Sequence, residues 1–251
     1  MKTKLFRIAA ALFCFAQAAG AAEIALLSGG AVEPGLKPVV AAFEAATGHT
    51  VRITFNAAPQ IASRLGAGEP WDVVIAPLAV LDAAARTAKV GAERVGVGRV
   101  GLGVAVRPGA PLPAIGDAAS VKRSILEADS VVYNRASTGQ LVEKMLRNMG
   151  IEEQVVPKAK RHADGASAME HLLQGSGREI GFGALTEIRL FKDRGLLLVG
   201  PLPPELQVYT TYAAALPAAG SRSDAVRQLL DYLATPAART SFTAAGVDPP
   251  T

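Results

Sequence analysis

The sequence predicts an α/β protein of two lobes connected by two crossing strands, and three observations lead to this prediction. Apolar strand candidates alternate with amphipathic helix candidates along most of the chain, as in sheets built by strand-helix-strand crossovers. Residues 72–76 are apolar on both faces, which is typical of a parallel strand covered by helices. Two long extended segments, residues 101–106 and 207–216, have no helix directly after them. We expect these two segments to pass between the lobes.

Each element follows from a local pattern. An apolar run from residue 24 ends in a Ser-Gly-Gly turn, and the next apolar residues recur at helical spacing until Gly48, which can close a helix. The following run alternates apolar and polar residues, as a half-buried strand does. In chain order, we expect strands at 24–27, 51–55, 72–76, 131–133, 180–183 and 196–199, and helices at 36–47, 61–65, 141–149, 164–173 and 226–233.

The predicted organisation follows the two extended segments. Residues 1–21 are expected to be a signal peptide, residues 22–103 and 212–251 to form lobe one, and residues 104–211 to form lobe two. The chain has 251 residues, of which 50% are hydrophobic and 19% charged. One large domain or two modest domains are both compatible with this length, so composition does not choose between them.

The N-terminus has the three parts of a secretory signal peptide. Lys2, Lys4 and Arg7 precede an apolar stretch from residue 8 to about residue 18, and small residues follow. The alternative is an N-terminal membrane anchor, but the stretch is shorter than the roughly 20 residues that a span needs. The single cysteine, Cys14, lies inside this stretch. We therefore expect a periplasmic protein without disulfides, thiol chemistry or a cysteine-ligated metal.

The net charge gives no indication of a nucleic-acid partner. The formal charge is +4, and three of these four charges come from the basic residues of the expected signal peptide. No run of lysines and arginines with aromatic neighbours remains after them. We therefore expect no nucleic-acid binding.

Four turns are candidates for ligand binding, because ligands of open α/β sheets lie beyond the carboxyl ends of the strands, near backbone N–H groups and helix starts. Each has a structural alternative: the glycine pair can be a tight turn, the Ser-Thr pair a helix cap, and Arg135 a solvated loop cation. The candidate ligand-binding residues in these turns are Ser28, Gly29, Gly30, Ala31, Ala57, Ala58, Arg135, Ser137, Thr138, Gly139, Asp164 and Gly165.

Catalytic signatures are weak in this sequence. His49, His162 and His171 have no carboxylate or cysteine neighbours at metal-ligand spacing, and neither an HExxH nor a GxSxG motif is present. We expect no metal, no cofactor and no catalytic activity. Two alternatives stay open: a periplasmic hydrolase with a cryptic active site in the same cleft, and the ligand-binding domain of a transcriptional regulator.

Several segments together resemble the type II periplasmic solute-binding proteins, most closely the molybdate-binding-like branch. They are the first strand with its glycine turn and residues 43–48, 66–75 and 232–238. The resemblance implies a monomeric, two-lobed receptor that closes on a small anionic solute and delivers it to an inner-membrane ABC permease. It also implies ligand contacts near Ala31, Ala58, Thr138, Gly165 and Ala184. Three of these positions are alanine where the family has hydroxyl groups, so a small carboxylate suits the site at least as well as a molybdate-like oxyanion. We expect the ligand to be one of these two kinds of anion.

Overall fold

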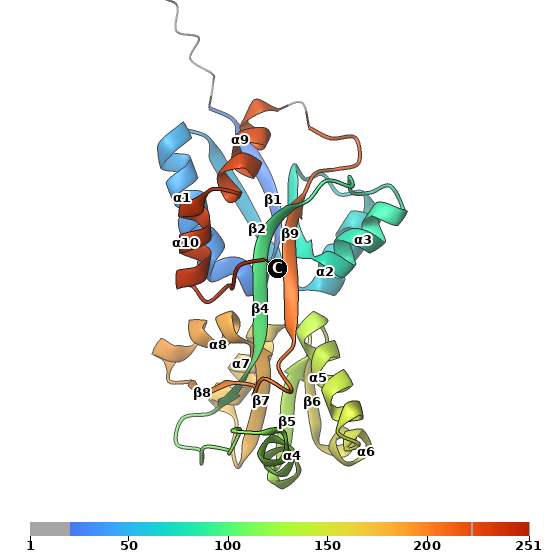
Figure 1. The fold of residues 1–251 in the computed structure, drawn as a ribbon, viewed down its shortest axis with the longest axis vertical. Coiled ribbons are helices and arrows are strands. Elements are labelled where there is room, and N and C mark those ends of the chain that lie inside the picture. Colours follow the sequence, from blue (N-terminus) through green and yellow to red (C-terminus); the bar gives the residue numbers. More distant parts are fainter. Residues whose placement is uncertain (1–20, 222, 251) are drawn as a thin grey trace, which may run out of the picture.

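The computed structural model describes residues 21–221 and 223–250, and it has the expected two-lobed α/β architecture (Figure 1). The expected signal peptide lies outside these residues, apart from its last position. The two lobes are stacked along the long axis of the molecule, and β4 (Val95–Val106) and β9 (Tyr209–Ala215) run through the middle from one lobe to the other.

Lobe one consists of three consecutive strand-helix units and two C-terminal helices. The first helix begins after a 3-10 turn, η1 (Gly30–Val32), and ends at Gly48, whose φ of 74° is the left-handed conformation that favours glycine. The strands are β1 (Glu23–Gly29), β2 (Thr50–Asn56) and β3 (Val73–Pro77), and the helices are α1 (Glu33–Thr47), α2 (Ala58–Ala67), α3 (Leu78–Arg86), α9 (Asp224–Leu233) and α10 (Pro236–Ala244).

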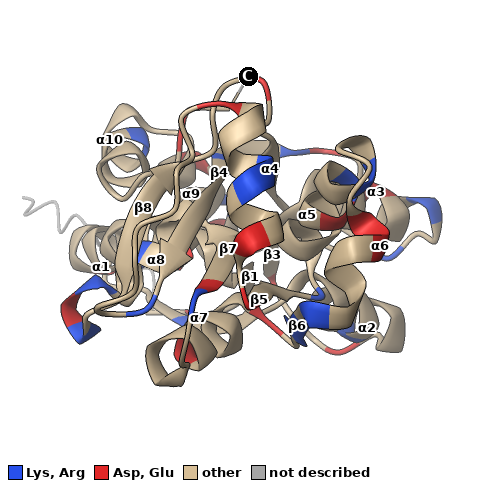
Figure 2. Ribbon diagram, turned by 90° about the horizontal axis from the view of Figure 1, so that it is seen from below, with Lys and Arg blue, Asp and Glu red and all other residues tan. Residues whose placement is uncertain are grey.

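Lobe two repeats the strand-helix order. Its strands are β5 (Ser130–Asn134), β6 (Ala159–His162), β7 (Glu179–Ala184) and β8 (Leu197–Pro201). Its helices are α4 (Ala118–Glu127), α5 (Ser137–Asn148), α6 (Glu152–Val155), α7 (Gly165–Gln174) and α8 (Leu185–Leu190), with two 3-10 turns, η2 (Val156–Lys158) and η3 (Lys192–Arg194). Figure 2 shows acidic and basic residues interspersed on the outer helices of this lobe.

One continuous sheet connects the lobes. Its strand order is β2-β1-β3-β9-β4-β7-β5-β6, and β8 pairs with β4 beside this path. β4 pairs with β9 up to Gly101 and with β7 from Leu102 onward, so it changes its partner where it passes from one lobe to the other. The predicted lobe boundaries at 103/104 and 211/212 fall inside β4 and β9.

Apolar side chains cover both faces of the sheet in each lobe. In lobe one, α1, α9 and α10 pack on one face, and α2 and α3 pack on the other. In lobe two, α4, α5 and α6 lie opposite α7 and α8. All five residues of β3 are buried, as its apolar sequence predicts for a parallel strand between two helical layers.

The main differences from the predicted elements are short or polar segments. Five helices, α3, α4, α6, α8 and α10, and strand β6 were not expected, whereas every expected strand and helix is present. β6 has the sequence Ala-Lys-Arg-His and lies at the edge of the sheet, so it lacks the apolar pattern of an inner strand. None of the helices in the described part is long and apolar enough to cross a membrane.

Candidate functional site

A cavity of about 280 Å³ lies between the lobes, where the carboxyl ends of the parallel strands of both lobes meet. Lobe one contributes the turns after β1 and β2, and lobe two contributes the starts of α5 and α7 together with α8. Besides the predicted ligand-binding residues, the residues that line the cavity include Glu33, Phe55, Asn56, Gln60, Pro77, Asn134, Glu187, Leu190, Phe191 and Tyr212.

The start of α5 is fixed by the buried side chain of Asn134, the last residue of β5. Its Oδ1 accepts hydrogen bonds from the N–H groups of Ala136 (2.9 Å) and Gly139 (3.0 Å). The first N–H groups of a helix have no partner within the helix. Among the hydrogen bonds between described residues, the N–H groups of Ser137 and Thr138 are therefore left for a ligand.

The start of α7 has a similar arrangement. The Oδ1 of Asp164 caps the helix by accepting a hydrogen bond from the N–H of Ser167 at 2.8 Å. Gly165 and Ala166 follow the cap and line the cavity. Their N–H groups are the donors that this helix can offer to an anion, and the positive end of the helix dipole adds to them.

Lobe one presents small residues to the cavity. Gly29, Gly30 and Ala31 lie at the turn into α1, and Ala57 and Ala58 lie at the start of α2. At the second turn, Oε1 of Gln60 accepts a hydrogen bond from the N–H of Ala57 at 2.9 Å. These residues leave room for a ligand, and they contribute backbone groups rather than side-chain hydroxyls.

The two lobes contact each other at one edge of the cavity. Thr186 of α8 is fully buried, and its hydroxyl donates a hydrogen bond of 2.5 Å to the carbonyl oxygen of Ala31. On the same helix, Arg189 packs closely against Gly246 near the C-terminus. This arrangement joins α8 of lobe two to the helical layer of lobe one.

The carboxyl group of Glu187 at the cavity has a raised pKa. Burial raises its pKa to about 7, the negative charges of Asp164 and Glu33 add to this effect, and the N–H of Ala184 opposes it. Among the described residues, its Oε2 atom is enclosed and has no hydrogen-bond partner. A carboxyl group with these properties can both accept and donate a proton near neutral pH.

Tyr212 of β9 lines the same cavity as this carboxyl group. It is only 4% exposed and lines the cavity. Burial raises the pKa of its hydroxyl far above the usual range, and the charge of Glu187 contributes to the increase. Both effects favour the neutral phenol.

The structure brings nine of the predicted ligand-binding residues to the cavity and places four elsewhere. The nine lining residues are Gly29, Gly30, Ala31, Ala57, Ala58, Ser137, Thr138, Asp164 and Gly165. Ser28 is buried in β1 and donates to the carbonyl oxygen of its neighbour, and Arg135 is exposed outside the cavity. Gly139 packs against the carbonyl oxygen of Asn134, and Ala184 is the buried N-cap of α8.

Sequence reasoning missed Glu187 and Tyr212 as candidate site residues. The available signal for Glu187 was an acidic residue three positions after the end of an apolar strand, where a helix can start. Tyr212 was interpreted only as part of a crossing strand. Its position at the cavity follows from the pairing of β9 with β3, which places it beside Pro77.

The cavity has no cationic side chain among the described residues that line it. The groups that it can offer to an anion are backbone N–H groups at the starts of helices. Within residues 21–221 and 223–250, no group of three or more His, Cys, Asp or Glu residues is placed to hold a metal ion.

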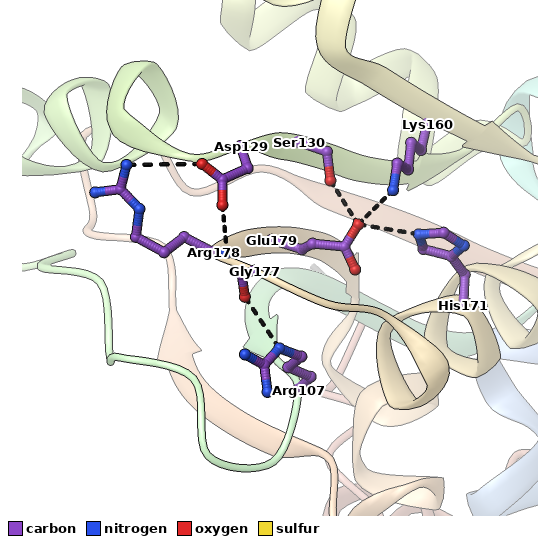
Figure 3. A network of polar contacts seen from close by, with 8 residues as sticks. All are labelled: Arg107, Asp129, Ser130, Lys160, His171, Gly177, Arg178 and Glu179. Carbon is purple, nitrogen blue, oxygen red and sulfur yellow. Dashed lines mark hydrogen bonds and ion pairs between the residues drawn. The ribbon is translucent and has the colours of Figure 1, made fainter.

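A second polar cluster lies in lobe two at the amino ends of β5 and β7 (Figure 3). The buried Oε1 of Glu179 accepts hydrogen bonds from Ser130 (2.7 Å) and Lys160 (2.6 Å), and it lies 3.2 Å from His171. Burial alone would raise the pKa of Glu179, but these three contacts outweigh it and lower the pKa. This cluster is separate from the cavity between the lobes.

Comparison with known proteins identifies the family. Residues 24–248 match the family described as bacterial extracellular solute-binding protein. The chain belongs to this family. The solute-binding fold is also found in the periplasmic molybdate-binding protein of Azotobacter vinelandii, which is 14% identical with a TM-score of 0.72 over 91% of this chain and 100% of that one. The tungstate ABC transporter structure from Geobacter sulfurreducens is 15% identical, with a TM-score of 0.70 over 88% of this chain and 98% of that one.

The predicted family and fold are therefore confirmed, but the predicted lack of catalytic activity is wrong. The present chain is 29% identical to an aconitate isomerase from a Pseudomonas species. The match extends over 235 residues, which are 90% of this chain and 87% of the relative. The relative is an enzyme, whereas this sequence contains neither an HExxH nor a GxSxG motif.

Proposed function

We propose that the protein binds a small organic anion with several carboxylates in the cavity between its lobes and isomerises it, with aconitate as the first substrate to test. The relationship to an aconitate isomerase over 90% of this chain supports the choice of substrate. The position of the cavity, between the starts of helices from both lobes, supports an anionic ligand.

The observation that carries the proposal is the combination of two kinds of lining. The starts of α5 and α7 offer N–H groups for carboxylates, while Phe55, Pro77, Leu190 and Phe191 offer apolar surface for a carbon skeleton. An inorganic oxyanion has no apolar part to fill such a surface. The methyl groups of Ala31 and Ala58, in place of hydroxyl groups, also favour an organic anion.

A solute-binding fold suits such an isomerisation. Donors from two lobes converge on the ligand only when the lobes are closed, and closure removes water from the reacting carbons. The buried contact between Thr186 and Ala31 is the kind of interaction that stabilises a closed arrangement. In this proposal, binding and isomerisation use the same cavity.

Delivery of the bound anion to an inner-membrane ABC permease is a second candidate role. Membership of the bacterial extracellular solute-binding protein family supports it, and it requires a periplasmic location. A deletion strain that loses uptake of radiolabelled aconitate, and regains it with the wild-type gene, would support this role.

The test of the main proposal uses trans-aconitate and cis-aconitate with the purified protein. Isothermal titration calorimetry measures binding, and proton NMR follows the appearance of the other isomer over time. We expect stoichiometric binding and multiple turnovers. Absence of both binding and conversion with either isomer would exclude aconitate as ligand and substrate. Molybdate and sulfate serve as competing ligands, and preferential binding of either would contradict the assignment to an organic anion.

A further inference from the structure

One carboxyl group at the cavity differs from the others in having an unused, enclosed oxygen. The carboxylates of Asp164 and Glu33 have partners: Asp164 caps α7, and Glu33 pairs with Lys37. Among the described residues, the Oε2 of Glu187 has no partner and is shielded from solvent. A buried polar atom without a partner is costly, so its presence at a cavity needs an explanation.

The carboxyl group of Glu187 lies where the two lobes meet. A Cβ atom built on Gly165, at the start of α7, would be 2.0 Å from Oε2, and one built on Gly30, in the turn after β1, would be 3.5 Å from Oε1. Only glycine at position 165 therefore allows the carboxyl group its present place. Because Gly30 belongs to lobe one and Glu187 to lobe two, the group is positioned beside ligand-binding elements from both sides.

The groups around Glu187 favour its neutral form but leave it able to ionise. Asp164, the N-cap of α7, and Glu33 of α1 are the acidic groups at the cavity whose charges raise its pKa, and Tyr212 of β9 is a neutral phenol at the same cavity. No cationic side chain lines the described part of the cavity to pin the group in its charged form. Its pKa of about 7 matches the requirement for a group that must both take up and return a proton at neutral pH.

We propose that Glu187 is the proton-transfer residue of this site and moves a proton between two carbons of the bound unsaturated polycarboxylate. This inference rests on the proposed function. The carboxylate of Glu187 removes a proton from the methylene carbon next to the double bond, and the released electron pair becomes the new carbon–carbon double bond. The electron pair of the old double bond accepts the proton back from Glu187 at its far carbon, so no atom or electron is gained or lost.

The starts of α5 and α7 have a defined part in this step. As the proton leaves, negative charge spreads from carbon onto the substrate carboxylates. The N–H groups of Ser137, Thr138, Gly165 and Ala166 lie at the same cavity and can stabilise this charge. The step needs no redox partner, because the substrate and product have the same oxidation state.

The experiment compares Glu187→Gln, Glu187→Asp and the wild type, with Glu153→Gln on the exposed face of α6 as the control. Gln keeps the size and hydrogen-bonding ability of the side chain but cannot carry a proton between carbons. We expect Glu187→Gln to bind trans-aconitate within about threefold of the wild type at pH 7 but to lose at least about 100-fold in kcat. Glu187→Asp should retain partial turnover, and its pH–rate profile should still show the ionisation of a carboxyl group at this position. Glu153→Gln should match the wild type in binding and in kcat.

The outcomes separate this inference from the proposed function. If the wild type and Glu187→Gln isomerise aconitate at rates within threefold of each other, the role of Glu187 is excluded while the proposed function stands. If the wild type binds neither isomer, the proposed function fails and this inference fails with it. If the wild type binds but shows neither conversion nor deuterium incorporation from heavy water, isomerisation and the role of Glu187 both fail, while ligand binding stands. Circular dichroism melting confirms that each variant is folded.

Discussion

At the scale of single residues, we expect the ionisation of Glu187 to make ligand affinity depend on pH. A bound anion disfavours the charged carboxylate, so it raises the pKa of Glu187 above its value of about 7 in the free protein. The complex then holds more protons than the free protein in this range, and affinity falls as pH rises through it. If the pKa rises by one unit on binding, affinity for trans-aconitate falls about tenfold between pH 6 and pH 9.

Calorimetry at several pH values checks this prediction. Glu187→Gln should bind with an affinity that does not change over the same range, because its side chain cannot ionise. A wild-type affinity that is constant from pH 6 to pH 9, or that rises with pH, would contradict the assigned pKa direction.

Lys160 stabilises the charged form of the buried Glu179 carboxyl group. It donates a hydrogen bond to the buried Oε1 of Glu179 (Figure 3). Because the pKa of Glu179 is lower in the folded protein, its ionised form stabilises the fold at pH values above the unfolded-state pKa. This contribution is lost as pH falls through the folded-state pKa. Lys160→Met leaves a buried carboxylate with fewer donors. We expect the free energy of unfolding at pH 7 to fall by about 1–3 kcal/mol.

Urea unfolding at pH 7 and pH 4 measures this effect. The difference from the wild type should shrink at pH 4, because burial without Lys160 raises the pKa of Glu179 and the group becomes neutral. The double variant Lys160→Met/Glu179→Gln should recover part of the loss at pH 7. The exposed Lys89→Met serves as control, and an equal loss there would show that the effect does not come from the cluster.

At the scale of elements, two glycine-to-alanine changes should act in opposite directions. In α5, a Cβ on Gly139 would be 1.6 Å from the carbonyl oxygen of Asn134, so Gly139→Ala must displace the start of the helix. In α2, Gly66 is exposed and a Cβ there meets nothing within 4 Å. Thermal and urea unfolding should show a loss of more than about 2 kcal/mol for Gly139→Ala and a gain of roughly 0.5 kcal/mol for Gly66→Ala. Equal effects would contradict the packing of α5 on β5.

The same scale shows which parts of the fold the sequence predicts. β3 and β7 are buried along their whole length, and buried strands have mostly apolar sequences. Both strands could therefore be predicted from the sequence. β6 is a polar edge strand and α8 has six residues, too few for a helical repeat to be recognised. The turns after β1, β2 and β5 were predicted as ligand sites because each follows an expected strand, and the turn after β6 because it opens an expected helix. The structure places residues of all four turns at the cavity.

The candidate acid was not predicted, for a physical reason. The environment of Glu187 is made by Gly30, Asp164 and Tyr212, which belong to three other segments of the chain. Its raised pKa is therefore a property of the assembled molecule, and α8 alone contains only an ordinary glutamate at a helix start.

At the scale of the whole molecule, we expect the contact of α8 with lobe one to stabilise a closed arrangement of the lobes. The Thr186 hydroxyl donates to the Ala31 carbonyl across the gap between the lobes, and both residues are buried. Thr186→Val keeps the shape of the side chain but removes the donor, so the Ala31 carbonyl loses its partner when the lobes are closed. One such hydrogen bond contributes about 0.5–1.5 kcal/mol, and its loss shifts the equilibrium toward open arrangements.

Because the ligand contacts both walls only when the lobes are closed, this shift should weaken binding of trans-aconitate by about three- to tenfold. Small-angle scattering of the ligand-free variant should also show a larger radius of gyration than the wild type, and saturating ligand should remove the difference. The matched control is Thr240→Val, because the Thr240 hydroxyl donates to a carbonyl within its own helix, α10, at 3.0 Å. If Thr186→Val and Thr240→Val have the same affinity and the same scattering profile, the contact between α8 and lobe one does not control closure.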